Sequence, residues 1–121
     1  MNYSQIEIEK KVFSAQKSWA DYIIKIGEFK SDNRKIIELV NQLIEDLYAF
    51  KTTKVLFKPT KARVIPFRST KEEFISYFIA SNNACTEDKG FALEPWKSIE
   101  FENYGITNSE QSITAVGNYF F

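Results

Sequence analysis

Side chains that could perform acid–base or metal chemistry are few in this sequence, because its 121 residues contain no histidine and a single cysteine, Cys85. Imidazole is the side chain whose unperturbed pKa lies near neutral pH, so an enzyme built on this chain needs a different base. A zinc site of the usual histidine and cysteine ligands cannot be assembled within one chain, and no spacing of acidic residues matches a calcium loop. We therefore expect no metal ion and no other cofactor.

Two hydroxyl groups and two ammonium groups remain as candidates for binding a small polar ligand. Thr60 and Tyr77 can orient a water molecule or hydrogen-bond an oxyanion, although neither hydroxyl is a good base near pH 7. Lys58 and Lys61 flank Pro59 and could attract an anion. Pattern alone favours structural roles instead: a threonine that bonds its own backbone at a loop end, a core tyrosine with its hydroxyl at the surface, and lysines of a solvated loop.

The remaining thiol and carboxylates have simpler interpretations. Cys85 lies in a polar segment with only Lys89 as a basic neighbour, so we do not expect a reactive thiolate. Glu94, Glu100 and Glu102 alternate along a predicted strand, which is typical of a solvent-facing side rather than of a paired acid and base.

Length and composition predict one folded domain over residues 1–121. Sixteen basic residues balance sixteen acidic ones, so no global charge attracts nucleic acid or a membrane surface. Apolar residues make up 44% of the chain and aromatic residues 16%, which excludes a disordered protein. No apolar run reaches the length of a membrane span. A single cysteine and the lack of a leader segment predict a cytoplasmic protein.

Two long amphipathic helices are predicted in the first half of the chain. Apolar residues recur every three or four positions over residues 4–28, and Gly27 is expected to help end this helix. Asp32 is a plausible N-cap for a second helix over residues 33–50. The second helix has the clearest apolar stripe, formed by Ile36, Ile37, Val40, Leu43, Ile44, Leu47 and Tyr48.

The centre of the chain predicts short elements joined by loops. Residues 55–57 are typical of a short strand, and residues 62–67 could form another, confined to a sheet edge by a proline. Thr70 and Glu73 match a capping box that begins a third helix. Residues 81–90 carry turn signals and form the longest predicted loop.

The last part of the chain predicts antiparallel strands. Partial alternation follows Trp96 as far as Glu102, and residues 112–121 alternate more regularly. Residues 108–110 between them are typical of a hairpin turn. Helices followed by antiparallel strands give an α+β fold. The sequence stops at Phe121 within an apolar strand, so we expect the C-terminal strands of the domain to be missing.

Five blocks of residues carry a more specific prediction. In chain order they are Val55-Leu56-Phe57-Lys58-Pro59-Thr60-Lys61-Ala62, Ser76-Tyr77-Phe78, Glu87-Asp88-Lys89-Gly90-Phe91-Ala92-Leu93-Glu94-Pro95-Trp96, Phe101-Glu102-Asn103 and Ala115-Val116-Gly117-Asn118-Tyr119-Phe120-Phe121. From Trp19 to its last residue the chain resembles the bacterial and algal family that contains the iota-class carbonic anhydrases. The family has the SnoaL-like, nuclear transport factor 2-like fold, a cone of N-terminal helices packed on a curved antiparallel sheet.

The resemblance implies a homodimer in which carbon dioxide is hydrated to bicarbonate without a bound metal. It implies catalytic and substrate-binding roles for Thr60, in the Lys-Pro-Thr block, and for Tyr77, in the Ser-Tyr-Phe block. Family members add a His and a Ser from a His-His-Ser-Ser motif, on strands that follow the block at which this sequence ends. Two functions stay open: a carbonic anhydrase with an incomplete active site, and a non-catalytic ligand-binding or dimerisation module of the same fold.

Overall fold

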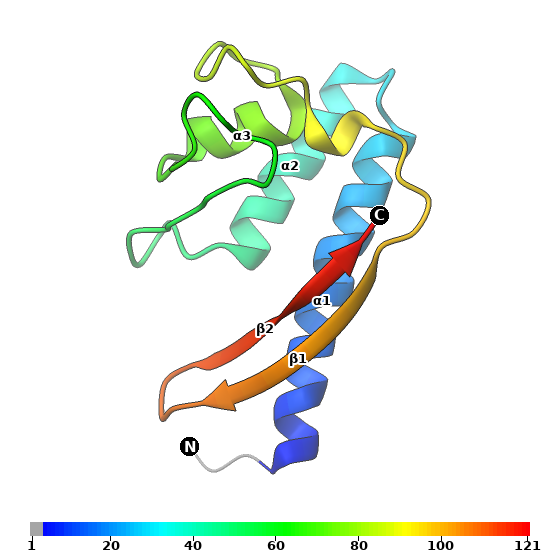
Figure 1. The fold of residues 1–121 in the computed structure, drawn as a ribbon. Helices are drawn as coiled ribbons and strands as arrows, with labels where there is room; N and C mark the ends of the chain where they lie inside the picture. Colours follow the sequence, from blue (N-terminus) through cyan, green and yellow to red (C-terminus); the bar gives the residue numbers. More distant parts are fainter. Residues whose placement is uncertain (1–3) are drawn as a thin grey trace. The chain divides into compact units, whose positions relative to one another are not determined.

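The computed structural model describes residues 4–121 as helices followed by one antiparallel strand pair (Figure 1). In chain order its elements are α1 (Gln5–Glu28), α2 (Asn33–Leu47), α3 (Lys71–Ile79), the short 3₁₀ helix η1 (Phe91–Leu93), β1 (Glu100–Asn108) and β2 (Ile113–Phe120). The chain divides into two compact units, one formed by residues up to Asp21 with Lys97–Phe121 and the other by Tyr22–Trp96. This order of elements confirms the predicted α+β class.

Over residues 4–121, no helix combines the length and the apolar character that a membrane-spanning helix requires.

Helix α2 supplies much of the core of the unit Tyr22–Trp96. The side chain of Asp32 accepts a hydrogen bond from the backbone N–H of Lys35 at 3.1 Å, which confirms the predicted N-cap. The predicted apolar stripe is wrong at one position, because Ile37 is 40% exposed whereas Leu39 is 2% exposed. Leu39 follows Ile36 by three residues, the spacing that keeps two side chains on one helix face. The helix also ends at Leu47, three residues earlier than predicted.

Gly27 has a different role from the one predicted. The residue lies inside α1, which continues to Glu28, and it is buried. A Cβ atom at this position would lie 3.1 Å from the carbonyl oxygen of Glu94 and 3.2 Å from that of Ala92. The glycine therefore permits close backbone approach rather than ending the helix.

The two short strands predicted in the centre of the chain are largely absent from the structure. Between residues 51 and 70 the only pairing is an isolated bridge in which Phe57 and Arg68 exchange backbone hydrogen bonds of 2.9 and 2.8 Å. Pro59 and Pro66 lie inside the bridged segment, and a proline has no N–H to extend a ladder. The chain between the two prolines therefore forms a loop closed at its base by one bridge.

Helix α3 begins with the predicted capping box. The Thr70 hydroxyl accepts from the backbone N–H of Glu73 at 3.2 Å, and the Glu73 carboxylate accepts from the backbone N–H of Thr70 at 3.0 Å. Both hydrogen bonds satisfy N–H groups that have no partner inside the helix.

Replacing Thr70 with alanine should lower the free energy of unfolding by about 1 kcal/mol, because the cap of α3 is lost. Thr70→Ser keeps the hydroxyl and serves as the matched control. Urea denaturation followed by circular dichroism measures both variants, and a loss of equal size in the serine variant would contradict a capping role for the hydroxyl.

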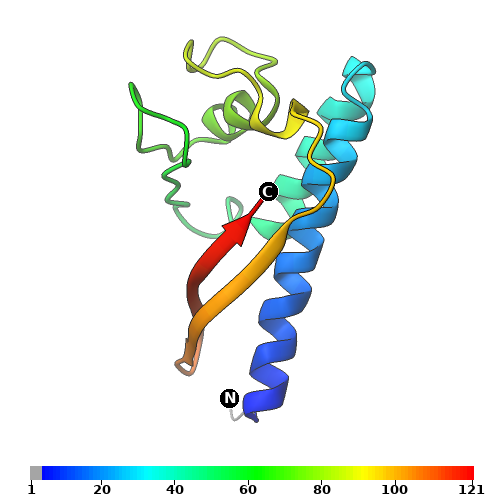
Figure 2. The same cartoon turned by 45° about the vertical axis from the view of Figure 1, so that its right-hand side comes forward.

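The other unit contains the β1–β2 hairpin and the N-terminal part of α1. The register runs from Glu100 opposite Phe120 to Asn108 opposite Ile113, with a bulge on β1 between Asn103 and Gly105. The turn after Asn108 confirms the predicted hairpin, whereas β1 begins at Glu100 rather than at Trp96. Figure 2 shows that both strands bend along their length, as expected for a curved sheet.

Aromatic side chains join this hairpin to α1. The ring of Trp19 makes edge-to-face contacts with Phe101, Tyr119 and Phe121 at centroid distances of 6.3, 5.8 and 6.2 Å. The amide groups of Gln16 and Asn103 hydrogen-bond each other reciprocally, at 2.8 and 3.1 Å. These contacts give a two-stranded ribbon a packed face, which an isolated hairpin lacks.

Candidate functional site

A pocket of about 670 Å³ lies within the unit Tyr22–Trp96. Its walls come from the loop after Phe57, from α3 and from the loop that leads into η1; the lining residues are Thr60, Lys61, Arg63, Tyr77, Glu87, Asp88, Lys89, Gly90, Phe91 and Glu94. The structure therefore brings together Thr60 and Tyr77, the two residues singled out by the family resemblance. Their roles in binding and catalysis stay predictions.

Tyr77 is held firmly at the side of this pocket. Its ring is stacked on Phe91 with centroids 5.5 Å apart and contacts Phe57 edge to face at 5.6 Å. The residue is 6% exposed, and its hydroxyl oxygen accepts a hydrogen bond from the backbone N–H of Lys61 at 3.3 Å. The hydroxyl is thus engaged with the loop that carries Thr60, whereas pattern alone placed it at the surface.

Thr60 and Lys61 occupy a turn of that loop. Pro59 is buried, and its carbonyl oxygen accepts from the N–H of Ala62 at 3.2 Å, which closes the turn around the two residues. Thr60 is exposed to solvent. The ammonium of Lys61 lies 3.6 Å from a carboxylate oxygen of Glu94. Lys61 therefore lines the pocket with an anionic partner, while its side chain stays 59% exposed, as expected for a lysine of a solvated loop.

Aromatic rings surround the ammonium of Lys61 as well. It lies 5.8 Å from the ring centroid of Phe91 and 5.7 Å from that of Trp96, within the range of cation–π attraction. Lys58, the other lysine beside Pro59, is 6.0 Å from the ring of Phe67 and does not line the pocket.

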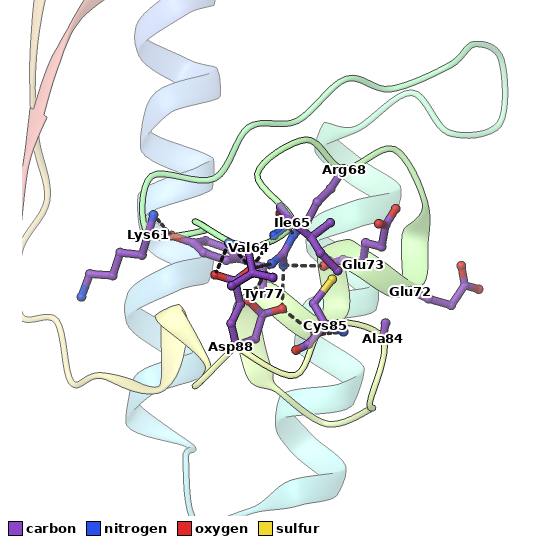
Figure 3. A network of polar contacts seen from close by, with 12 residues as sticks. Lys61, Val64, Ile65, Arg68, Glu72, Glu73, Tyr77, Ala84, Cys85 and Asp88 are labelled. Carbon is purple, nitrogen blue, oxygen red and sulfur yellow. Dashed lines mark hydrogen bonds and ion pairs between the residues drawn. The ribbon is translucent and has the colours of Figure 1, made fainter.

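A buried network of charges supports the floor of the pocket (Figure 3). The guanidinium of Arg68 donates two hydrogen bonds to the carboxylate of Asp88, at 2.6 and 2.9 Å. The side chain of Arg68 is fully buried and that of Asp88 is 3% exposed. Ser76 donates to the same carboxylate at 2.5 Å and accepts from the N–H of Cys85 at 3.3 Å. The network connects α3 with the loops on both sides of it.

Sequence reasoning missed Arg68 and Asp88 as a pair. They lie twenty residues apart, with Asp88 in the loop predicted over residues 81–90 and Arg68 between a predicted edge strand and a predicted helix. Bidentate geometry of this kind fixes an arginine and a carboxylate in one relative orientation. The pair therefore sets the position of the loop that carries Asp88, Lys89 and Gly90 into the pocket.

Gly90 allows this loop to turn toward η1. Its φ angle is +87°, a backbone conformation that residues other than glycine rarely adopt. A Cβ atom at this position would lie 2.7 Å from a methyl carbon of Leu93. A larger residue at this position would move the pocket wall.

The environment shifts the pKa of two buried groups. Burial on its own lowers the pKa of Arg68, but its hydrogen bonds and charge interaction with Asp88 raise it above the ordinary value, so the guanidinium stays charged. Burial raises the pKa of the Cys85 thiol, which agrees with the expectation that this cysteine is not a reactive thiolate.

The carboxylate of Glu87 holds the loop that contains residues 63–65. One oxygen accepts from the backbone N–H of Arg63 at 2.7 Å, the other accepts from the N–H of Ile65 at 2.7 Å, and the N–H of Val64 donates to the second oxygen at 3.0 Å. The guanidinium of Arg68 lies 3.5 Å from the same carboxylate. Hydrogen bonds from Arg63 and Ile65, followed by that from Val64 and the charge of Arg68, lower the pKa of Glu87.

Stability should decrease at acidic pH because of this carboxylate. A pKa that is lower in the folded state than in the unfolded state adds stability above the unfolded pKa, and this stability is lost as pH falls through the folded pKa. Thermal unfolding of the chain should therefore occur at lower temperature as pH decreases below the ordinary range of glutamate. Glu87→Gln should flatten that pH dependence, whereas an unchanged slope would show that other carboxylates cause it.

Among the charged side chains that line the pocket, those without an ion-pair partner in the described part of the chain are positively charged. Asp88 and Glu87 face Arg68, and Glu94 faces Lys61. Within residues 4–121, no ion pair joins the side chain of Arg63 or Lys89 to a carboxylate. Two cations beside the hydroxyl groups of Thr60 and Tyr77 suit a small anion with several oxygen atoms.

Residues 4–121 contain no group of three or more histidine, cysteine, aspartate or glutamate side chains arranged to hold a metal ion.

Comparison with known proteins gives consistent matches. A family model described as metal-independent carbonic anhydrase matches residues 10–121. A metal-independent carbonic anhydrase of Nostoc sp. (strain PCC 7120 / SAG 25.82 / UTEX 2576) is 35% identical over 114 residues, which cover 91% of this chain and 55% of the relative. The chain thus spans about half the length of that relative.

A solved structure matches as well. The crystal structure of the iota-carbonic anhydrase from a cyanobacterium, complexed with bicarbonate, has a TM-score of 0.85 and 33% sequence identity, over 92% of this chain and 70% of the other. This likeness confirms the predicted nuclear transport factor 2-like fold.

Proposed function

The chain belongs to the family of metal-independent carbonic anhydrases, and we propose that it takes part in the reversible hydration of carbon dioxide to bicarbonate without a metal ion. The observation that carries the proposal is the single pocket shared by Thr60 and Tyr77, beside Arg63 and Lys89. Bicarbonate in the solved relative supports the choice of ligand.

The reaction places new negative charge on oxygen. A water oxygen bonds to the carbon of carbon dioxide, one carbon–oxygen π bond is replaced by a lone pair on oxygen, and a proton leaves to solvent. Thr60 and Tyr77 carry hydroxyl groups that can donate to the oxygen atoms of bicarbonate. Donors held in place before reaction stabilise developing oxyanion charge more than mobile water does. We assign these two residues to substrate binding and catalysis.

A binding titration tests the proposal. Adding bicarbonate should shift the amide resonances of residues around the pocket in the ¹⁵N–¹H spectrum. Thr60→Ala and Tyr77→Phe should each weaken binding by about tenfold to a hundredfold, because a hydrogen bond to a charged ligand contributes about 1.5–3 kcal/mol. Tyr104→Phe, at a position 93% exposed in the other unit, is the matched control. Unchanged pocket resonances at the highest bicarbonate concentration would count against the assignment.

A homodimer is the assembly that we propose. Several large apolar side chains of the loop between the two prolines and its flanks are exposed, among them Leu56 at 81%, Val64 at 79% and Phe67 at 72%. Exposed apolar clusters of this kind support an interface. They also favour the alternative function, a dimerisation module without catalysis. Light scattering tests the assembly, and a stable monomer at high concentration would contradict it.

A cytoplasmic location is also proposed. Its support is the single, buried cysteine, which has no partner for an internal disulfide in these 121 residues. Fluorescence microscopy of a tagged chain tests the location, and signal confined to another compartment would contradict it.

A further inference from the structure

The three backbone N–H groups of Arg63, Val64 and Ile65 converge on one carboxylate. They belong to consecutive residues of a loop, and the carboxylate of Glu87 accepts from all three at 2.7–3.0 Å. Consecutive N–H groups that point to one side form a concave site for an anion. Here the anion is a side chain of the same protein, and it is 18% exposed.

This contact is one of several that hold the loop, which also include a hydrogen bond from the side chain of Arg68 to the carbonyl oxygen of Ile65 at 3.0 Å. At its base, Phe57 and Arg68 exchange two backbone hydrogen bonds. Near its middle, the N–H of Lys61 donates to the hydroxyl of Tyr77. Glu87 then joins two segments of the chain. One is the part of this loop that follows Ala62, and the other is the segment that carries Asp88 into the wall of the pocket.

The position of Glu87 is itself fixed by its neighbour. Asp88 is locked to the buried guanidinium of Arg68 by two hydrogen bonds, so the backbone at Glu87 has little freedom. Arg68 also lies 3.5 Å from the carboxylate of Glu87. The negative charge of Glu87 is therefore met by an arginine and by three N–H dipoles, and it does not oppose an anion in the pocket.

We propose that Glu87 is a positioning residue for the pocket: by holding residues 63–65, it fixes the turn that presents Thr60 and Lys61 to the ligand. This inference rests on the proposed binding of bicarbonate at the pocket. Glu87 lies in the pocket lining, but both oxygens of its carboxylate are engaged by the N–H groups of residues 63–65, so we assign its effect to the loop. A neutral amide at this position cannot satisfy the three N–H groups, because it has only one acceptor oxygen. Its NH₂ group, itself a donor of two hydrogen bonds, would face backbone N–H groups that are also donors.

Glu87→Gln tests the inference in the complete 121-residue chain, at a temperature where the variant is folded. Amide hydrogen exchange within residues 63–65 should become roughly tenfold faster or more wherever the N–H group faced the oxygen that the amide nitrogen replaces. The dissociation constant for bicarbonate, measured by the resonance titration, should rise about tenfold. Glu72→Gln is the matched control, since Glu72 is an exposed glutamate of the same unit, and it should change neither quantity.

The two readouts separate a positioning role from a merely structural one. A glutamate that only stabilised the fold would leave the bicarbonate affinity of the folded variant unchanged, and that result would overturn the inference. Unchanged exchange at residues 63–65 would overturn it as well. Should Glu87→Gln not fold, Glu87→Asp keeps the charge on a shorter side chain and should weaken binding to a smaller degree. If the wild-type chain binds no bicarbonate, both the proposed function and this inference are refuted. That holds even if amide hydrogen exchange confirms the contact between Glu87 and residues 63–65.

Discussion

Replacing Asp88 with alanine is expected to destabilise the fold by about 3–5 kcal/mol, because the variant leaves a charged guanidinium buried without its partner. The side chain of Arg68 is fully buried, and both of its terminal nitrogens donate to Asp88. Hydrogen bonds to the carbonyl oxygens of Ile65 and Glu73 remain, but they carry no compensating charge. The carboxylate of Glu87 also remains, 3.5 Å away, but it makes no hydrogen bond to the guanidinium and is already engaged by the N–H groups of residues 63–65. Urea denaturation measures the loss, with Glu110→Ala, at an exposed glutamate of the other unit, as the control.

A double variant shows whether the uncompensated charge causes the loss. In Arg68→Met with Asp88→Leu, both charges are replaced by apolar groups of similar volume, and such replacements are often neutral. The double variant should therefore be more stable than Asp88→Ala. Equal or greater destabilisation in the double variant would contradict an effect of uncompensated charge and would point to packing instead.

Replacing Phe74 with alanine should cost about 3–5 kcal/mol, through lost burial and the cavity left behind. Phe74 is 0% exposed, and its ring lies 5.1 Å from Tyr48, 4.8 Å from Phe50 and 4.3 Å from Phe57. These partners come from the end of α2 and from the following loop, so the cavity would open at the junction of several segments.

Phe67→Ala is the matched control for this substitution. Its side chain is 72% exposed in the same unit, so the expected change is within about 0.5 kcal/mol. The same urea titration measures both variants. Similar losses at the two positions would contradict the assignment of Phe74 to the core.

The helices and their caps could be predicted from the sequence because their signals are local. Asp32 and Thr70 each act on an N–H group three residues further on, and such a spacing is visible in one short segment. The stripe of α2 was nearly complete for the same reason, with Ile37 and Leu39 exchanged. The error at Ile37 arises because it directly follows the buried Ile36, and neighbouring residues lie about 100° apart around a helix.

The strands near the centre of the chain could not be predicted by composition. Residues 55–57 have strand propensity, yet pairing depends on a neighbour. Pro59 on the same segment and Pro66 on the facing segment remove donors that a longer ladder needs. Only the bridge between Phe57 and Arg68 remains.

The charged part of the site could not be predicted because its partners are distant or belong to the backbone. Arg68 meets Asp88 across twenty residues, and nothing in either segment indicates the other. Glu87 binds the N–H groups of residues 63–65, which every amino acid except proline provides, so side-chain types carry no signal. Thr60 and Tyr77 were selected by resemblance to a family, and the structure places both at one pocket.

The most direct test of metal-independent carbon dioxide hydration is the loss of oxygen-18 from labelled carbon dioxide, followed by mass spectrometry in the presence of a strong chelator. The purified 121-residue chain should accelerate the loss above the rate in buffer, with or without the chelator, and Thr60→Ala and Tyr77→Phe should reduce that acceleration. Loss at the buffer rate, or an acceleration that the chelator abolishes, would contradict the proposed function.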